Sequence, residues 1–251
     1  SDVYKRQLEA FEYLKTYSGL TDSNNLTYRR WLNDGQNLVK KSPADGYLLQ
    51  GFAYHLLGDI SLAITSMQKA RRLNDYFGKI NYATLVFRSG DYQQSIQVCL
   101  DLLAQNKEDQ YVRSLLLECA DFALDADLVK KLLQSDKGNE VLQSLALSID
   151  KEIQVLSDIG IDKMAYIAVK QAVFELLSNY YVGDCVIKPC VIDNEMGKQV
   201  QLSVYLDNVG IDDCLRLDNA LLDKLIDDEL PFDQYKNVVV HFIPAKYAKV
   251  A

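Results

Sequence analysis

Apolar residues in the first 150 positions recur at the three- and four-residue spacing of amphipathic helices, and short polar or glycine-containing stretches interrupt them. This pattern predicts short helices joined by tight turns. It is strongest in GYLLQGFAYHLLGDISLAITSMQKARRLND, residues 46–75, where two apolar stretches flank Gly58. We therefore expect an antiparallel helix pair in this segment, with the turn at Gly58.

Two glycines, Gly51 and Gly58, fall inside this otherwise helical stretch. A glycine costs about 1 kcal/mol relative to alanine in a helix interior, so each position needs a physical reason. We expect Gly51 to let a neighbouring helix approach closely, with Tyr54 and Met67 filling the remaining space. Gly58 is expected to reverse the chain direction.

The same pattern returns 32 residues later. GDISLAITSMQKA, which starts at Gly58, aligns without a gap with GDYQQSIQVCLDL, which starts at Gly90. A third copy over residues 111–133 keeps the helix pair and loses the glycine, and LDAD at 124–127 is its predicted turn. A fixed period in the thirties with one helix pair per period indicates a helical solenoid.

Small and aromatic residues occupy set positions in the pair at 44–75: Tyr47, Gly51, Tyr54, Gly58, Ala63, Met67 and Ala70. In these positions the segment resembles a tetratricopeptide repeat. It departs from the family at Gln50, where leucine is usual, and at Asp75, where proline is usual. The matching places in the second copy depart further: Ala83, Val86, Gly90, Ser95, Cys99 and Leu102. The resemblance covers roughly residues 22–140 and implies a solenoid whose concave face binds partner peptides.

The first helix of each pair forms this concave face, so its residues that are not used for packing are expected to line a groove. These residues are Phe52, His55, Thr84, Phe87, Arg88, Glu118, Asp121 and Phe122. Two alternatives stay open. The three phenylalanines are equally typical of a hydrophobic core, and the C-terminal part of the chain has the length to fold back into the groove.

The pattern changes near Gly160. Residues 162–181 predict an amphipathic helix whose apolar side includes Met164, Ile167, Ala168, Val173, Phe174 and Leu177. Alternating apolar positions then predict strands at 185–193, 199–207 and 237–244, a hairpin turn at 194–198 and a helix at 218–230. The predicted fold class is therefore α + (α+β), with a tetratricopeptide-like domain at 1–150 and a small αββαβ domain at 155–251.

Pro189 places the strand at 185–193 at the edge of its sheet, because proline cannot donate to a neighbouring strand. An exposed edge suits pairing with another chain, so this strand is a candidate contact for a homodimer through the C-terminal domain. His241 lies in the strand at 237–244, on the face opposite to Val238, Val240 and Phe242, and is expected to point away from the core.

The formal net charge of −8 bears on which classes of partner the protein is expected to bind. The basic residues occur as separate pairs and form no block, so nucleic acid is not an expected partner. Residues 205–233 hold nine acids and two bases. Three interpretations stay open for them: a carboxylate metal site at Asp207, Asp212 and Asp213, an acidic patch that extends to Asp218 and docks a basic partner, and a plain solvated helix face. Since the calcium-loop spacing is not met, we expect no metal.

Five cysteines, an odd number without framework spacing, indicate a reducing compartment. Cys99 and Cys119 are expected to be small buried side chains. No apolar run approaches the roughly 18–20 residues of a membrane span, and no signal peptide opens this chain. These features predict a cytoplasmic protein.

Catalytic sequence motifs are missing: the chain has no phosphate-binding glycine loop, no nucleophile elbow and no paired-histidine motif. We therefore expect a non-enzymatic adaptor that binds a protein or peptide partner and needs no cofactor. One alternative is an enzyme or ligand-binding module in the C-terminal domain near residues 207–213. Another, by fold analogy alone, is a chaperone-like subunit of a bacterial secretion or surface assembly.

Overall fold

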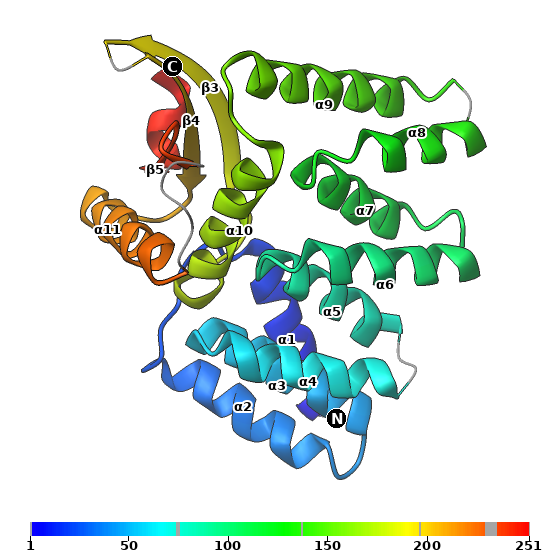
Figure 1. Ribbon diagram of the computed structural model, residues 1–251. Helices are drawn as coiled ribbons and strands as arrows, with labels where there is room; N and C mark the ends of the chain where they lie inside the picture. Colours follow the sequence, from blue (N-terminus) through cyan, green and yellow to red (C-terminus); the bar gives the residue numbers. More distant parts are fainter. Residues whose placement is uncertain (1, 74–75, 137, 196, 229–234, 251) are drawn as a thin grey trace.

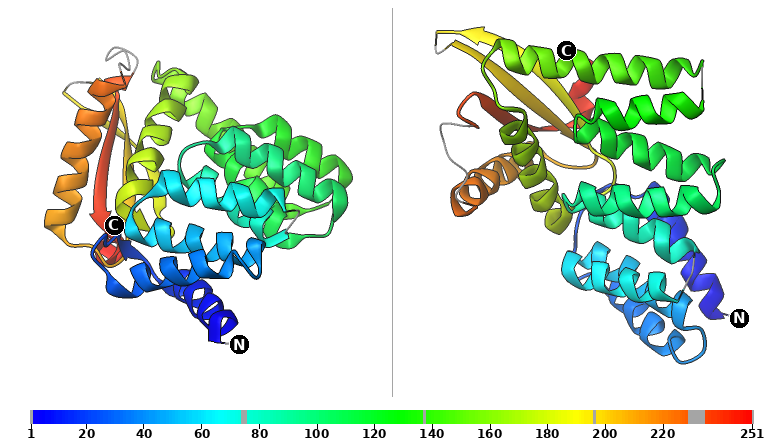
Figure 2. Two further views of the ribbon diagram at one scale, coloured as in Figure 1. Left: turned by 90° about the horizontal axis from the view of Figure 1, so that it is seen from below. Right: turned by 45° about the vertical axis from the view of Figure 1, so that its right-hand side comes forward.

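The structure is a computed structural model that describes residues 2–73, 76–136, 138–195, 197–228 and 235–250 (Figure 1). Antiparallel helix pairs form a stack, and a three-stranded sheet with its own helices lies along one flank of that stack (Figures 1 and 2). This arrangement confirms the predicted α + (α+β) fold class. Among the described residues, no helix is long and apolar enough to cross a membrane.

The stack contains α1 (Asp2–Thr16), α2 (Leu26–Leu38), α3 (Pro43–Leu57), α4 (Ile60–Arg72), α5 (Tyr76–Arg88), α6 (Tyr92–Gln105), α7 (Gln110–Phe122), α8 (Ala126–Ser135) and α9 (Glu140–Asp158). The remaining elements are β1 (Gly19–Leu20), α10 (Lys163–Tyr180), β2 (Tyr181–Val182), β3 (Val186–Asn194), β4 (Gly197–Leu206), α11 (Ile211–Asp227), β5 (Val238–Pro244) and the short 3-10 helix η1 (Ala245–Val250).

The turns inside the helix pairs α3–α4, α5–α6 and α7–α8 share one geometry. An aspartate caps the second helix of each pair by accepting a hydrogen bond from the backbone N–H three residues on, at 2.9–3.1 Å; these aspartates are Asp59, Asp91 and Asp125. The residue before each aspartate has a left-handed backbone, with φ of 85° at Gly58, 91° at Gly90 and 49° at Leu124. The third pair therefore keeps the predicted turn without its glycine.

Two glycines let helices approach closely. A β-carbon at Gly51 would lie 2.6 Å from Met67 Cε, so α3 and α4 meet at this point as the sequence predicts. A β-carbon at Gly78 would lie 2.7 Å from the carbonyl carbon of Ala70, which brings α5 against the backbone of α4. The first contact lies within the pair α3–α4, and the second joins that pair to the next pair, α5–α6.

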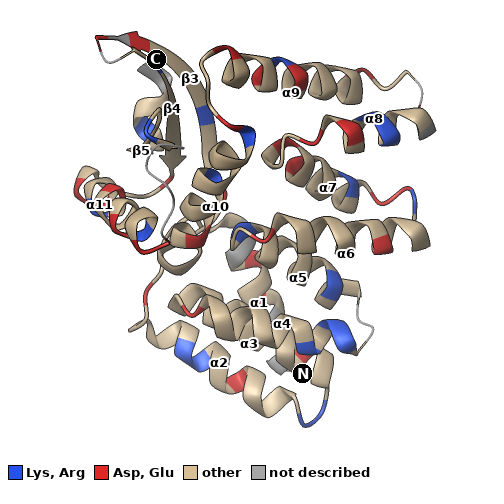
Figure 3. Ribbon diagram, in the orientation of Figure 1, with Lys and Arg blue, Asp and Glu red and all other residues tan. Residues whose placement is uncertain are grey.

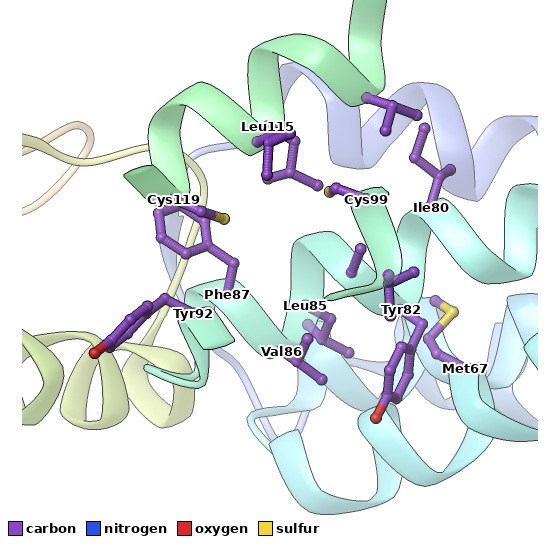
Figure 4. Packing of buried hydrophobic residues seen from close by; sticks show 14 of the residues in the cluster. Met67, Ile80, Tyr82, Leu85, Val86, Phe87, Tyr92, Cys99, Leu115 and Cys119 are labelled. Atoms are coloured by element: carbon purple, nitrogen blue, oxygen red, sulfur yellow. The ribbon is translucent and has the colours of Figure 1, made fainter. Parts of the chain in front are cut away.

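A hydrophobic cluster runs through the stack from α3 to α7 (Figure 4). Met67, Ile80 and Leu115 are among its buried members. Cys99 and Cys119 are fully buried in it, as predicted, and Cys119 Sγ lies 3.3 Å from Ser95 Oγ. The cluster also takes in Ile167 of α10, so the stack and the helix that follows it share apolar contacts.

The strand order of the sheet is β3-β4-β5. β3 pairs antiparallel with β4, and β5 pairs parallel with β4 after the crossover through α11. β3, which carries Pro189, is therefore an edge strand, as predicted. β4 is central, and its predicted inner residues Val200, Leu202, Val204 and Leu206 are 0–2% exposed. His241 is exposed on β5, also as predicted.

Two predictions about the helices of this region were wrong. α11 begins at Ile211, two turns before the predicted start at 218, because the Asp213 carboxylate accepts a 3.0 Å hydrogen bond from the Gly210 N–H and caps the helix there. Its predicted last two residues, 229–230, lie outside the described residues. Met164, assigned to the apolar side of α10, is 60% exposed.

α10 links the two parts of the chain. Lys224 Nζ of α11 lies 2.6 Å from Glu175 Oε2 of α10, and a core cluster joins Tyr166 and Val169 of α10 to Val200 and Leu202 of β4. β1, just after α1, pairs with β2, just after α10. The predicted boundary near residue 150 falls inside α9, which continues to Asp158. The parts therefore pack against each other through continuous apolar contacts.

Candidate binding groove

The inner helices α3, α5 and α7 present equivalent positions to the concave face of the stack. Counted back from the capping aspartates, the position seven residues earlier holds Phe52, Thr84 and Glu118, and the position four residues earlier holds His55, Phe87 and Asp121. Both positions therefore carry an acidic side chain on α7 and none on α3 or α5. All eight residues predicted for the groove line one of two adjacent hollows.

The first hollow lies over α3 and α5 and has a volume of about 470 Å³. Aromatic rings make up much of its wall: Phe11, Tyr17, Phe52, Tyr76, Phe77 and Tyr111. Of the predicted residues, Phe52, His55, Thr84 and Arg88 lie here. Phe77 and Tyr111 are 56% and 58% exposed, so the hollow has an open aromatic rim.

The second hollow lies over α5 and α7 and has a volume of about 430 Å³. The predicted residues Phe87, Arg88, Glu118, Asp121 and Phe122 line it. Its other walls come from elements outside the three helix pairs: Glu152 of α9, Tyr166, Lys170 and Phe174 of α10, Gly183, Asp184 and Cys185 of the connection between β2 and β3, and Ile187 and Pro189 of β3.

Residues 183–185 lie between the hollows. Gly183, Asp184 and Arg88 line both, and Arg88 forms an ion pair with Asp184. The alternative that the C-terminal part folds into the groove is thus realised in part. The phenylalanine alternative is realised too, because Phe52, Phe87 and Phe122 are 6–7% exposed and belong to the core while they line the hollows.

His55 is 7% exposed, and its side chain makes no hydrogen bond with any residue that the structure describes. Burial, assisted by the positive charge of Arg88, lowers the pKa of His55 to about 3. The imidazole is therefore neutral at physiological pH and offers one donor and one acceptor nitrogen to the first hollow.

Glu118 and Asp121 lie one helical turn apart on α7 and both line the second hollow. Within the described ranges, neither carboxylate accepts a hydrogen bond or forms an ion pair. Burial raises the pKa of both groups, Asp184 adds to the effect at Glu118, and Arg88 and Lys170 counteract it at Glu118 and Asp121 respectively. Both residues are exposed, so their carboxylates are accessible from the hollow.

Lys170 is the group in the groove that the sequence analysis missed. It is 6% exposed, and its Nζ lies 5.0 Å from the ring centroids of both Phe122 and Tyr166. It forms no hydrogen bond or ion pair with the part of the chain that the structure describes. Burial lowers the pKa of Lys170 to about 8, and Glu152 and Asp121 oppose that shift. A signal was present, because Lys170 shares a helical face with Ile167 and Phe174.

Three phenylalanines form the floor between α5, α7 and α10. Phe87 and Phe122 have ring centroids 5.6 Å apart, and Phe174 lies 5.4 Å from Phe87 and 4.8 Å from Phe122. Phe122 meets both other rings edge to face, with interplanar angles of 84°, an arrangement that aromatic pairs prefer. The second hollow therefore combines an aromatic floor with charged walls.

The acidic patch predicted at residues 207–218 divides into two kinds of residue. Asp213 caps α11 and pairs with Arg216 at 3.2 Å, and Asp218 Oδ1 accepts a 3.0 Å hydrogen bond from the Phe242 N–H. Asp207 and Asp212 remain exposed. No group of three or more potential metal ligands occurs among the described residues. Figure 3 shows the acidic segments of α11 and basic residues on separate elements such as α2, α8 and β3.

No protein-family model and no curated protein matches this chain.

Proposed function

We propose that this protein is a non-enzymatic adaptor that binds an extended segment of a partner protein in its concave groove, and that its helix pairs are tetratricopeptide-like repeats. The observation that supports this most is the pair of adjacent hollows along α3, α5 and α7, which together contain every residue expected to face a partner. Solenoids of helix pairs present such concave surfaces to ligands.

The aromatic rim supports the choice of a protein segment as ligand. Phe77 and Tyr111 are more than half exposed beside a hollow of about 470 Å³, so an apolar side chain that enters it would cover both rings. Burial of apolar area contributes roughly 25 cal/mol per Å². Contiguous exposed apolar surface of this kind is typical of protein interaction sites.

The non-enzymatic part of the proposal rests on the missing catalytic sequence motifs. The ligand-binding alternative near 207–213 has less support, because Asp213 and Asp218 already accept hydrogen bonds from the backbone of Gly210 and Phe242. The groove is thus the better candidate for a binding site.

The test is affinity capture from native lysate followed by cross-linking and mass spectrometry, with binding constants measured on each captured partner. The groove variant is Phe77→Ala/Tyr111→Ala, which removes two exposed rings and leaves the core intact. The matched control is Leu62→Ala/Leu100→Ala, which removes side chains 43% and 39% exposed on the outer helices α4 and α6. We expect the groove variant to weaken binding by about tenfold or more, since interface aromatics often contribute over 1 kcal/mol each.

Cross-links from a partner to α3, α5 and α7 are expected in the wild type and in the control. A partner that binds the groove variant as tightly as the wild type, with cross-links outside the inner helices, would contradict the proposal.

A further inference from the structure

We propose that the partner segment carries a lysine or arginine whose side chain enters the second hollow between Glu118 and Asp121, while Lys170 donates a hydrogen bond to a backbone carbonyl of the same segment. The inference rests on the proposed function and adds the chemistry of the ligand. It follows from the charges that line the hollow and from the buried and unpartnered Lys170.

The ionisable lining of the second hollow is unbalanced. Glu118, Asp121, Glu152 and Asp184 contribute four carboxylates, and Arg88 and Lys170 contribute two cations. Since Arg88 pairs with Asp184, one ammonium faces three carboxylates. A cationic side chain from a ligand would restore the balance, and the i, i+3 spacing of Glu118 and Asp121 places two acceptors on one face of α7 for it.

The accessibility of these carboxylates favours the same ligand. Glu118 and Asp121 are exposed where they line the hollow, and neither forms a hydrogen bond or ion pair with the described protein. An arriving guanidinium or ammonium group would form charge-assisted hydrogen bonds with them, which are stronger than neutral ones.

Lys170 indicates that the ligand also brings an acceptor. The residue is 6% exposed, it lines the hollow, and it has no hydrogen-bond partner among the described residues. An ammonium with this little access to water gains from an acceptor that the ligand supplies. A backbone carbonyl satisfies it without adding negative charge next to Asp121 and Glu152, the carboxylates that act on Lys170 electrostatically.

A negatively charged ligand fits less well, because the carboxylates that line the hollow would repel it. A phosphate or carboxylate bound to Lys170 would lie among Glu118, Asp121 and Glu152, all of which line the hollow. The Phe122 ring of the floor already contacts the Lys170 ammonium, whose Nζ lies 5.0 Å from the ring centroid, so the incoming cation is expected at the carboxylates of α7 and not at this ring.

The experiment uses capped amino acids, so it does not depend on the identity of the partner. The probes are Nα-acetyl-arginine N-methylamide, its neutral analogue with citrulline, and its anionic analogue with glutamate. Their dissociation constants are measured with the full chain by amide chemical-shift titration. We expect the arginine probe to shift amides of α7 near 118–122 and to bind about tenfold tighter than the citrulline probe, the factor that corresponds to about 1.4 kcal/mol.

Two variants separate the roles of the residues. Glu118→Gln/Asp121→Asn should remove the preference for arginine, whereas Asp207→Asn/Asp212→Asn, which changes the net charge equally outside the groove, should retain it. Lys170→Met should weaken the citrulline probe, which loses the hydrogen bond to its backbone carbonyl, and should weaken the arginine probe less, because loss of the ammonium also removes a repulsion on that cation. Far-UV circular dichroism of each variant checks that the fold is kept.

Equal binding of the arginine and citrulline probes, or tighter binding of the glutamate probe, would overturn this inference. The failure would be distinct from failure of the proposed function. If the partner still depends on Phe77 and Tyr111 while arginine shows no preference, the groove binds a partner of other chemistry. If the partner ignores those rings, the groove assignment itself is wrong.

Discussion

Arg88 on α5 forms an ion pair with Asp184, a residue 96 positions later in the connection between β2 and β3. The pair holds residues 183–185 over the groove at the point where the two hollows adjoin. The side chain of Arg88 is 33% exposed and that of Asp184 is 87% exposed. Ion pairs this accessible to water contribute little to stability, so the effect of this contact is mainly on the position of the segment.

Asp184→Ala should therefore leave the free energy of unfolding within about 1 kcal/mol of the wild type. It should also speed amide hydrogen exchange at residues 183–185, because the ion pair from α5 no longer restrains them. Urea unfolding and exchange mass spectrometry measure the two effects. Asp193→Ala, which removes an exposed carboxylate on β3, is the control and should change neither. A loss of several kcal/mol in Asp184→Ala would show that the pair has a structural role.

Alanine variants at Gly90 and Gly138 distinguish the cost of backbone strain from the cost of contact with α10. Both glycines have left-handed backbones, with φ of 91° and 94°. A β-carbon at Gly90 would lie 3.0 Å from Glu175 Cγ and 3.2 Å from the Gln171 carbonyl oxygen of α10, whereas at Gly138 no described atom lies within 4 Å. Alanine at either position costs roughly 1–2 kcal/mol in the left-handed region, so the difference between the two variants reports the contact with α10.

We expect Gly90→Ala to lower the free energy of unfolding by at least about 1 kcal/mol more than Gly138→Ala, because close contacts with a packed helix add to the backbone strain. Chemical denaturation of both variants gives the comparison. Equal losses would mean that α10 moves away from the turn without cost.

His55 should make stability depend on pH. Its pKa is near 6.5 in the unfolded chain and about 3 in the folded protein, so the unfolded state binds the additional proton between these values. The free energy of unfolding should therefore fall as the pH drops from about 6.5 towards 3. At pH 4.5, which is two units below 6.5, the loss from this group is roughly 3 kcal/mol, at 1.36 kcal/mol per pH unit.

The variant His55→Leu isolates this effect. Glu118 and Asp121 have raised pKa values and act in the opposite direction, since the folded protein binds their protons first as the pH falls. They are present in both proteins, so the difference in free energy of unfolding between wild type and variant removes their contribution. We expect that difference to change by roughly 3 kcal/mol between pH 7.5 and pH 4.5. A constant difference would contradict the buried, neutral imidazole.

Much of the fold was predictable because its signals are local. Asp59 and Asp91 accept hydrogen bonds from amides three residues away, and Gly58 and Gly90 have left-handed backbones at the turns, so a short stretch of sequence contains both partners of each contact. The groove residues were predictable for a related reason. Helical periodicity decides which side of α3, α5 and α7 a residue occupies once the repeat is found.

The start of α11 shows where local reasoning failed. Asp212 and Asp213 fall between the predicted strand at 199–207 and the predicted helix at 218–230, yet Asp213 caps α11 from within its first turn. An acidic residue near a helix N-terminus and an acidic residue in a loop look alike until the backbone amide that it binds is known.

The sequence by itself determined the helix pairs, their period, the strands and the face of each inner helix, because the contacts that specify them lie within a few residues of each other. Only the tertiary structure decided that Asp184 meets Arg88, that α10 places Lys170 beside Phe122, and that β1 pairs with β2. These contacts join segments tens to more than a hundred residues apart. Their formation depends on how whole helices pack, and no short-range pattern of apolar and polar residues encodes it.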